Sequence, residues 1–341
     1  MIIFRADGNK TIGVGHVMRC LSIADALKGI GVGSAFICAD DNVEKLIKGR
    51  GFPVEILGTD YTKPDEETDV LLSCDSLKKA EGIVVDSYFV TESYFDILSE
   101  YVRSVYIDDY ESNFKVDGLI NYNVYADREA YERLYDPEKV RLFLGPQYAP
   151  LRKEFYDISP IQISEEVKNI LILTGGADPF HIALRLAKEI AGREDCKAVY
   201  HFVVGAFSSD LSELKKLADG NRIIIHQDVK DMKALMLKCD LAVSAAGSTL
   251  YELCACGIPT VNYTFADNQI AGAKAFSDSG IMMTAGDVRT NEDFACEIMR
   301  SVDRLSNDMV ERKRMSGSAH RLVDGCGAGR LAEGLEDLFR E

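Results

Sequence analysis

Short runs of valine, isoleucine and leucine alternate with longer amphipathic stretches along almost the whole chain. This alternation is typical of α/β proteins, in which helices cover both faces of a parallel sheet. In the first half of the chain, it predicts strands over 2–5, 34–38, 54–57, 83–86, 105–108 and 119–121. Helical patterns lie between most of these strands, for example over 15–28 and 93–101.

The alternation stops between about residues 127 and 164, where charged, aromatic and proline residues gather. It then resumes and predicts strands over 170–173, 199–204, 223–226, 241–244 and 259–262. A chain of 341 residues has room for about two domains of ~150 residues each. We therefore predict two Rossmann-like α/β/α domains, 1–150 and 165–341, which face each other across a cleft that holds the ligand.

The charge balance narrows the possible ligands. The chain has 39 Lys and Arg against 55 Asp and Glu, which gives a formal net charge of −16. Nucleic acids and anionic membranes are bound largely through clustered positive charge, so we expect neither as a partner. An anionic ligand such as a nucleotide diphosphate must instead be held by local groups, such as the N–H groups at helix N-termini.

Other features favour a cytoplasmic protein. The first predicted strand begins beside Met1, so we expect no secretory signal, and no apolar run approaches the ~20 residues of a membrane span. The nine cysteines include no C-x-x-C pair. This spacing favours free thiols in a reducing compartment over a thiolate zinc site.

The first candidate site follows the first predicted strand. Asp7 comes directly after this strand, and Gly13 and Gly15 permit a tight turn before the next helix. The third glycine of a dinucleotide-binding fingerprint is replaced by Met18. His16 stands at the helix start, where the helix dipole disfavours the imidazolium and leaves a neutral general base. A histidine that only caps or packs is the equal alternative.

The second candidate site follows the strand predicted over 241–244. Gly247 permits a turn, and Ser248 and Thr249 offer hydroxyl and amide donors to phosphate oxygens at the start of the next helix. Glu252, one turn further on, can accept two hydrogen bonds from the vicinal hydroxyls of a ribose. Its alternative is a carboxylate that interacts only with solvent and the helix dipole.

Two more loops carry candidate ligand contacts. Asn268 and Gln269 follow Asp267, the expected N-cap, and their amides suit sugar hydroxyl or acetamido groups. The turn at Gly175 and Gly176 either offers amides to the phosphates or the sugar, or is purely structural.

Polar residues also end several strands of the first half, at Asp86, Tyr88, Asp108 and Asp109. In a parallel sheet they lie along the same edge as His16, so they are candidate substrate contacts. Their spacing supports no complete set of metal ligands.

The order and combination of these motifs resemble one known family. The matching segments are Arg5-x-Asp7, Gly13-Val14-Gly15-His16-x-x-Arg19-Cys20, Asp86-Ser87-Tyr88, Asp108-Asp109, the run from Gly145 to Phe155, Ala245-Ala246-Gly247-x-Thr249-x-x-Glu252 and Ala266-Asp267-Asn268-Gln269. They resemble the UDP-2,4-diacetamido-2,4,6-trideoxy-beta-L-altropyranose hydrolases of pseudaminic acid biosynthesis, relatives of the lipid II N-acetylglucosaminyltransferases. The likeness runs from Met1 to about Asn268 and, more loosely, to 324–327.

The resemblance implies the GT-B fold and the hydrolysis of a UDP-sugar to free sugar and UDP. It implies that His16 activates water for attack at the anomeric carbon, with inversion, that Tyr88 and Asn268 contact the substrate, and that the helix after Gly247 holds the nucleotide. It implies no metal or other cofactor, and we expect a monomer whose partners are the UDP-sugar and UDP. The remaining predicted contacts are Asp7, Gly13, Gly15, Arg19, Gly175, Gly176, Ser248, Thr249, Glu252 and Gln269.

Two other functions stay open at this point: a GT-B glycosyltransferase that uses a UDP-sugar donor, and a UDP-sugar binding protein without turnover. The motifs also leave open the configuration of the sugar, which could belong to pseudaminic acid, a related nonulosonic acid or a spore-coat polysaccharide. They assign no role to Asp108, to Asp109 or to the mostly helical stretch 291–339.

Overall fold

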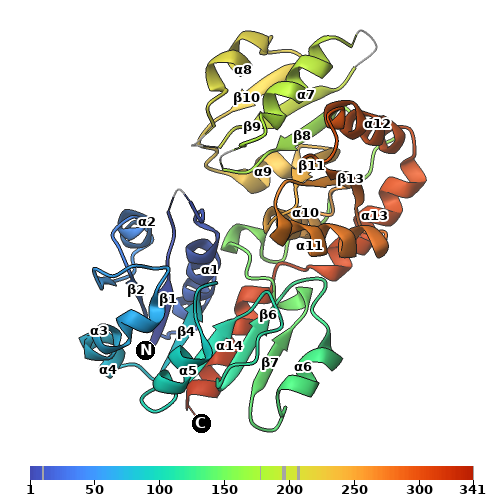
Figure 1. The fold of residues 1–341 in the computed structure, drawn as a ribbon. Helices are drawn as coiled ribbons and strands as arrows, with labels where there is room; N and C mark the ends of the chain where they lie inside the picture. The colour runs from blue at the N-terminus through green and yellow to red at the C-terminus, as the bar shows by residue number, and fades with distance from the viewer. Residues whose placement is uncertain (10, 177, 194–196, 206–207, 341) are drawn as a thin grey trace. The chain divides into compact units, whose positions relative to one another are not determined.

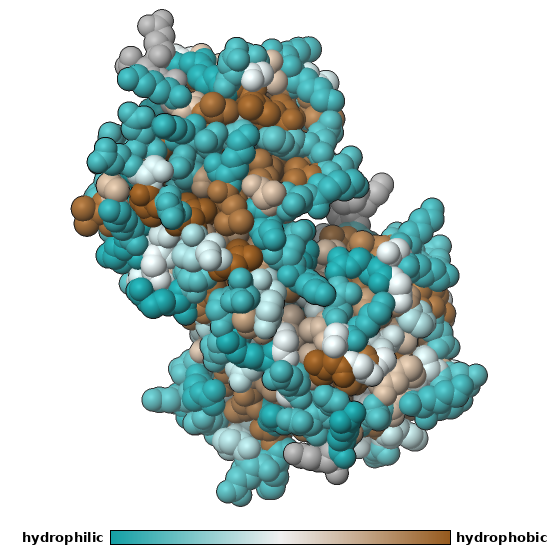
Figure 2. Space-filling view, turned by 180° about the vertical axis from the view of Figure 1, so that it is seen from behind, coloured by the Kyte–Doolittle hydropathy of each residue, from teal (hydrophilic) through white to brown (hydrophobic). Residues whose placement is uncertain are grey.

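The structure, a computed structural model, describes residues 1–9, 11–176, 178–193, 197–205 and 208–340. It divides into two compact units, residues 1–156 with 325–341 and residues 157–324 (Figure 1). The face drawn in Figure 2 is covered mainly by hydrophilic side chains, with apolar patches between them. No described helix is long and apolar enough to cross a membrane.

The first unit is built on a seven-stranded parallel sheet in the order β3-β2-β1-β4-β5-β6-β7. Every residue of the four strands at and beside its centre, β2, β1, β4 and β5, is buried, as expected for strands covered on both faces. The chain order reverses between β1 and β4, which makes their carboxyl ends a topological switch point. The strands are β1 (Ile2–Ala6), β2 (Ser34–Cys38), β3 (Val54–Ile56), β4 (Gly82–Asp86), β5 (Ser104–Ile107), β6 (Gly118–Asn121) and β7 (Arg141–Leu144).

Short helices connect these strands. The α-helices of the first unit are α1 (Gly15–Gly29), α2 (Glu44–Gly49), α3 (Thr68–Ser73), α4 (Asp75–Lys78), α5 (Glu92–Leu98), α6 (Arg128–Leu134) and α14 (Gly327–Arg340). Single 3₁₀ turns are η1 (Pro64–Glu67), η2 (Pro146–Tyr148) and η3 (Lys153–Phe155).

The last helix, α14, differs from the predicted domain boundaries. The prediction assigned 165–341 to the second domain, but α14 packs in the first unit, against α1 and η2 (Figure 1). The fit is close because glycines make room for its apolar face: a Cβ at Gly82 would lie 2.1 Å from the Phe339 ring, and one at Gly118 would lie 2.9 Å from Leu338. Arg103 also donates to the carbonyl of Leu338 at 2.7 Å. The prediction misassigned this helix because it grouped residues by their nearness in sequence.

The second unit repeats the plan with a six-stranded parallel sheet in the order β10-β9-β8-β11-β12-β13. Its switch point lies between β8 and β11. The strands are β8 (Asn169–Leu173), β9 (Val199–Val203), β10 (Ile223–His226), β11 (Leu241–Ala245), β12 (Thr260–Thr264) and β13 (Met283–Asp287). The helices are α7 (Ile182–Ala191), α8 (Leu211–Leu217), α9 (Met232–Leu237), α10 (Thr249–Cys256), α11 (Asp267–Asp278), α12 (Phe294–Ser306) and α13 (Met309–Leu322).

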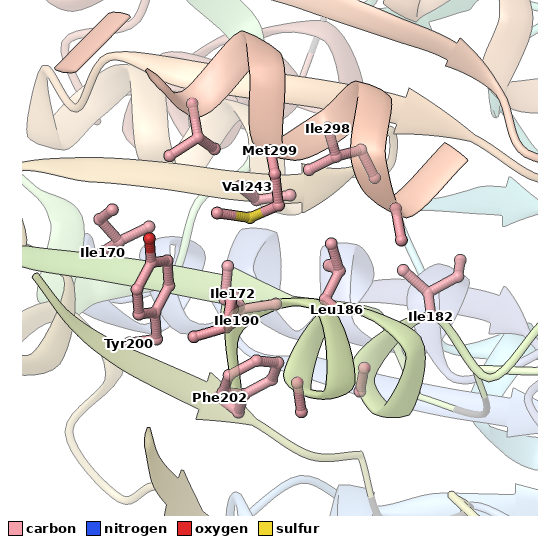
Figure 3. Close-up of a cluster of buried hydrophobic side chains, with 14 of the residues drawn as sticks. Ile170, Ile172, Ile182, Leu186, Ile190, Tyr200, Phe202, Val243, Ile298 and Met299 are labelled. Carbon is pink, nitrogen blue, oxygen red and sulfur yellow. The ribbon is translucent and has the colours of Figure 1, made fainter. Parts of the chain in front are cut away.

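One face of this second sheet carries a large apolar core. Strand residues such as Ile172, Phe202 and Val243 pack against α7 and α12, whose buried side chains include Leu186 and Met299 (Figure 3). Each fully buried aliphatic or aromatic side chain stabilises the fold by roughly 1.5–3 kcal/mol relative to its exposed state. This core fixes the positions of the strand ends in the second unit.

The two strands that the hydrophobic pattern missed, β7 and β13, both lie at sheet edges. Both α6 and β7 lie in the stretch 127–164, where the alternation stops, and they belong to the first unit, within the predicted bounds 1–150. In β7 only Phe143 and Leu144 are buried, and β13 has no buried residue. Strand β13 shows no continuous apolar run, and the short run 142–144 of β7 stands within the charged and proline-containing stretch 127–164, which masks it.

Candidate functional site

The switch point of the first unit brings His16 and Asp86 together. Ala6 at the end of β1 is paired in register with Asp86, the last residue of β4. From β1 the chain passes through a loop in which Gly13 adopts φ +75° and its carbonyl accepts from the N–H of Asn9. Helix α1 then begins at Gly15, one residue before His16. Gly13 thus has the left-handed conformation that its predicted turn requires.

His16 is a buried histidine with a charged partner. Its Nδ1 lies 2.6 Å from Oδ1 of Asp86, and only 9% of its side chain is exposed. The ring of Tyr88 meets the imidazole edge to face, with the centroids 4.5 Å apart. The position of His16 at the helix start therefore explains only part of its environment, because a carboxylate and an aromatic ring also fix the imidazole.

Arg19 lies one turn further along α1 and binds the same carboxylate. Its Nε and Nη2 each donate to Asp86 at 2.6 Å, and its Nη1 donates to Tyr122 at 3.0 Å and to Asp109 at 3.2 Å. Burial alone would raise the pKa of the Asp86 carboxyl, but Arg19 and His16 outweigh it and hold that pKa below its usual range. Arg19 was predicted as a ligand contact; in the structure its guanidinium binds groups of the protein.

Asp109 connects this cluster to Tyr88. Its carboxylate accepts from the Tyr88 hydroxyl at 2.9 Å and from the Asn123 amide at 2.6 Å, besides Arg19. Burial and the nearby Asp109 carboxylate raise the pKa of Tyr88, so its hydroxyl stays protonated. Asp108, by contrast, is fully buried and accepts from the Tyr131 hydroxyl and from backbone N–H groups after β5. Of the two acids without a predicted role, Asp109 therefore lies in the site, whereas Asp108 organises a loop.

A small pocket opens beside His16. Its walls are the side chains of Ile12, Tyr61, Tyr88 and Phe89, with His16, Asp86, Asp7 and Ser87 as polar neighbours. Asp7 was predicted as a ligand contact, and its carboxylate accepts from the backbone N–H of Ala39 at 2.7 Å and forms a buried ion pair with Arg5. The sequence analysis did not single out Ile12, Tyr61 or Phe89, since such residues look like ordinary core positions.

The second unit offers a helix start of another kind. After β11, Gly247 and Ser248 are exposed, and α10 begins at Thr249. The N–H of Gly247 is bonded to the carbonyl of Ala245, so it is turned inward. Ser248 and Thr249 lie at the helix start, where N–H groups have no carbonyl acceptor within the helix. Glu252 lies half-buried in the first turn of the same helix.

The loop after β8 also exposes backbone. Gly175 has φ +83°, and both Gly175 and Gly176 are exposed. The buried Asp178 carboxylate accepts from the N–H groups of Ile182 and Ala183 at 2.8 and 2.9 Å and so fixes the start of α7. Burial raises the pKa of Asp178. These contacts hold the glycine turn at the end of β8.

The predicted cap of α11 needs a correction. Ala266, not Asp267, occupies the N-cap position, and Asp267 pairs with Arg289 at 2.8 Å. The Oε1 atom of Gln269 accepts from the N–H of Phe265 at 2.9 Å, so this side chain closes the helix start. Asn268 is exposed at the same turn. Of the two predicted amides, Asn268 points to solvent and Gln269 has a structural bond.

Metal ligands were also sought within the described residues. No group of three or more His, Cys, Asp or Glu side chains there is arranged to hold a metal ion.

Comparison with known proteins gives related sequences. No protein-family model matches the chain. The spore coat polysaccharide biosynthesis protein SpsG of Bacillus subtilis is 24% identical over 98% of both chains. The UDP-2,4-diacetamido-2,4,6-trideoxy-beta-L-altropyranose hydrolase of Campylobacter jejuni is 26% identical over 74% of this chain and 86% of its own length. Protein MJ1062 of Methanocaldococcus jannaschii, named uncharacterized, is 28% identical over 75% of this chain, which spans 54% of that longer protein.

Solved structures agree on the architecture. MurG of Acinetobacter baumannii has a TM-score of 0.70 at 14% identity, covering 98% of this chain and 99% of its own. MnaA of S. aureus, in a co-structure with UDP, has a TM-score of 0.67 at 12% identity, covering 100% and 98%. The chain has the GT-B fold and is a relative of the UDP-sugar hydrolases. These hydrolase relatives and the fold confirm the resemblance on which the sequence analysis relied.

Proposed function

We propose that the protein hydrolyses a UDP-linked diacetamido-trideoxy hexose to the free sugar and UDP, in nonulosonic acid biosynthesis. The observation that carries this proposal is the position of His16, which lines a pocket at the switch point while its Nδ1 is engaged by Asp86. No bond from the described residues engages its Nε2 atom. An imidazole nitrogen held in this way at a ligand pocket suits a general base. The hydrolase relatives support the same chemistry.

In the proposed reaction, Nε2 of His16 removes a proton from water while the water oxygen attacks the anomeric carbon. The bond between that carbon and the phosphate oxygen breaks, and UDP leaves with the electron pair. Attack opposite the leaving group inverts the anomeric centre. The amides at Ser248 and Thr249 would meet the charge that develops on the phosphate, so the proposal requires no metal ion. Glu252 would accept hydrogen bonds from the ribose hydroxyls.

Apolar side chains beside His16 suit the methyl groups of a deoxy, acetylated sugar. Ile12, Tyr61 and Phe89 give the pocket an apolar wall, and Tyr88 adds an aromatic face with a protonated hydroxyl. Methyl groups, such as those of a 6-deoxy carbon or an acetamido group, bury favourably against such a surface, at roughly 0.8 kcal/mol per methylene-sized group.

A GT-B glycosyltransferase is the second candidate, because MurG shares the fold. The two functions differ in whether UDP is released without an acceptor. The deciding experiment incubates a panel of UDP-sugars, with 6-deoxy and 6-hydroxy members and one or two acetamido groups, and measures UDP. We expect release without acceptor, fastest for the diacetamido-trideoxy substrate. Release only when an acceptor sugar is added would establish the transferase, and binding without release would indicate a non-catalytic protein.

Labelled water tests the bond that breaks. In ¹⁸O water, attack at the anomeric carbon places the label in the sugar. Label in UDP would instead show attack at phosphorus and contradict the proposed role of His16.

A further inference from the structure

The Asp86 carboxylate lies buried between the imidazole and a guanidinium. Its Oδ1 lies 2.6 Å from Nδ1 of His16 and 2.6 Å from Nη2 of Arg19. Its Oδ2 lies 2.6 Å from Nε of Arg19. The side chain of Asp86 has no exposed surface. An ionised carboxylate only accepts hydrogen bonds. The hydrogen in the 2.6 Å contact with His16 must therefore come from the histidine, and the longer approach of Arg19 Nη2 to the same Nδ1, at 3.3 Å, is then a contact between two donors that both serve Asp86.

We propose that Asp86 is a positioning residue that holds His16 in the tautomer with its hydrogen on Nδ1, which leaves the lone pair of Nε2 directed at the pocket. The catalytic consequence rests on the hydrolase function proposed above, whereas the tautomer itself does not. The sequence analysis attributed a neutral His16 to the helix start alone. The contact with Asp86 on β4 also determines which ring nitrogen of His16 carries the hydrogen, which a helix dipole does not determine.

Arg19 makes this arrangement rigid. Asp109 and Tyr122 bind the other side of its guanidinium and fix its position. The carboxylate of Asp86 therefore has one orientation in which it accepts hydrogen bonds from both Arg19 and His16. Arg19 and His16 keep Asp86 ionised against the effect of burial, which would otherwise raise its pKa. The Tyr88 ring, tied to Asp109 through its hydroxyl, closes the other side of the imidazole. The ring of His16 is thus held by contacts at its edge and at one nitrogen.

The same contact would assist the chemical step. As His16 takes the proton of water on Nε2, the imidazolium that forms faces the negative charge of Asp86. The electron pair of the water O–H bond goes to the new bond with the anomeric carbon, and the pair of the broken bond leaves with UDP. Asp86 itself gains no proton, because it remains paired with Arg19 throughout.

The test replaces Asp86 by asparagine, which keeps the shape of the side chain. The amide oxygen at the Oδ2 position would still accept from Nε of Arg19, and the amide N–H₂ at the Oδ1 position would face Nδ1 of His16 and lose the bond from Nη2 of Arg19. The imidazole would then have to accept at Nδ1 and carry its hydrogen on Nε2. In serine proteases, the same change at the acid that orients a histidine lowers kcat about 10⁴-fold through the wrong tautomer. We expect kcat to fall for D86N by up to about 10³-fold, less than for removal of the imidazole itself, with KM changed less than about twofold. The matched control is Asp96→Asn, an exposed aspartate on α5, with unchanged kinetics.

A second measurement needs no turnover. In protein with ¹⁵N-labelled histidine, NMR distinguishes the two neutral tautomers, and His16→Gln assigns the signals among the five histidines. We expect the Nδ1–H form for His16 in the wild type and the Nε2–H form in D86N. An Nε2–H tautomer in the wild type, an unchanged tautomer in D86N, or unchanged kcat in D86N would overturn the proposal. If D86N does not fold, the wild-type tautomer still decides the matter. If the tautomer is as expected but no UDP-sugar is hydrolysed, the proposed function fails and the positioning by Asp86 stands.

Discussion

The switch points of the two units are alike in topology and different in the residues that fill them. In both, a loop containing a glycine joins a parallel strand to a helix start, at Gly13 in the first unit and at Gly247 in the second, but only Gly13 has a positive φ. The first is filled by a buried network around Asp86, whereas the second exposes a glycine and a serine. The contrast suits the roles that we propose for the two sites: a base requires a fixed tautomer and orientation, which charged neighbours provide, while a phosphate requires only backbone N–H groups that a ligand can reach.

The largest expected effect comes from removing the imidazole. His16→Ala should lower kcat by about 10²- to 10⁴-fold, the usual contribution of a general base. UDP affinity should stay within about twofold of the wild type, because we propose that the second unit binds the nucleotide. Steady-state kinetics and calorimetric titration with UDP measure the two quantities. Near-normal turnover would show that His16 is not the general base. A large loss of UDP affinity would show that the nucleotide is not bound by the second unit alone.

The second prediction concerns Glu252. Glu252→Ala should weaken UDP binding about tenfold, since hydrogen bonds to a charged group contribute roughly 1.5–3 kcal/mol. 2′-Deoxy UDP makes the test specific. The wild type should bind it more weakly than UDP, whereas the Glu252→Ala variant should bind 2′-deoxy UDP and UDP with the same affinity. The matched control is Glu213→Ala, on an exposed part of α8. If 2′-deoxy UDP still binds more weakly than UDP to the variant, Glu252 does not hold the ribose.

The third prediction uses the helix that crosses back into the first unit. Gly82→Ala would place a Cβ 2.1 Å from the Phe339 ring of α14, and overpacking of this kind costs about 1–3 kcal/mol. Gly33→Ala is the control, because its Cβ would meet nothing within 4 Å. Urea unfolding, followed by hydrogen exchange to separate the units, should show a loss in the first unit for Gly82→Ala only. Equal stability of both variants would show that α14 does not pack closely on β4.

The comparison also shows how far sequence alone reaches. The alternation predicted the buried strands of both sheets, because such strands are apolar throughout, but it missed β7 and β13 at the edges. The candidate residues were chosen from strand ends and helix starts. That choice placed His16 and Asp86 on one rim, yet it gave no strand order, and only the pairing of β1 with β4 makes them neighbours. Roles that depend on a partner far away in sequence, such as that of Arg19 beside Asp86 and Asp109, could not be read from the motifs.

The smallest predicted effect is a difference between the two units in how much acid lowers their stability. In the second unit, His201 lies 3.0 Å from both His226 and Asn169, and burial, with His226 and Lys238, lowers the pKa of His201 to about 4. The unfolded chain takes up this proton near pH ~6.5, so as the pH falls from 6.5 towards 4 the unfolded state binds more protons and stability is lost.

Asp86 in the first unit behaves differently, because its pKa lies below the usual value. Its contribution is lost only as the pH falls below ~3.9, where the unfolded chain begins to protonate it. The second unit should therefore weaken first, by less than about 1 kcal/mol between pH 7 and pH 6. Hydrogen exchange resolved by segment and corrected for intrinsic rates measures this difference. Burial also lowers the pKa of His226, so His201→Asn should reduce the response of the second unit without abolishing it, and should leave that of the first unchanged. The same slope in the variant would show that His201 does not carry the pH dependence.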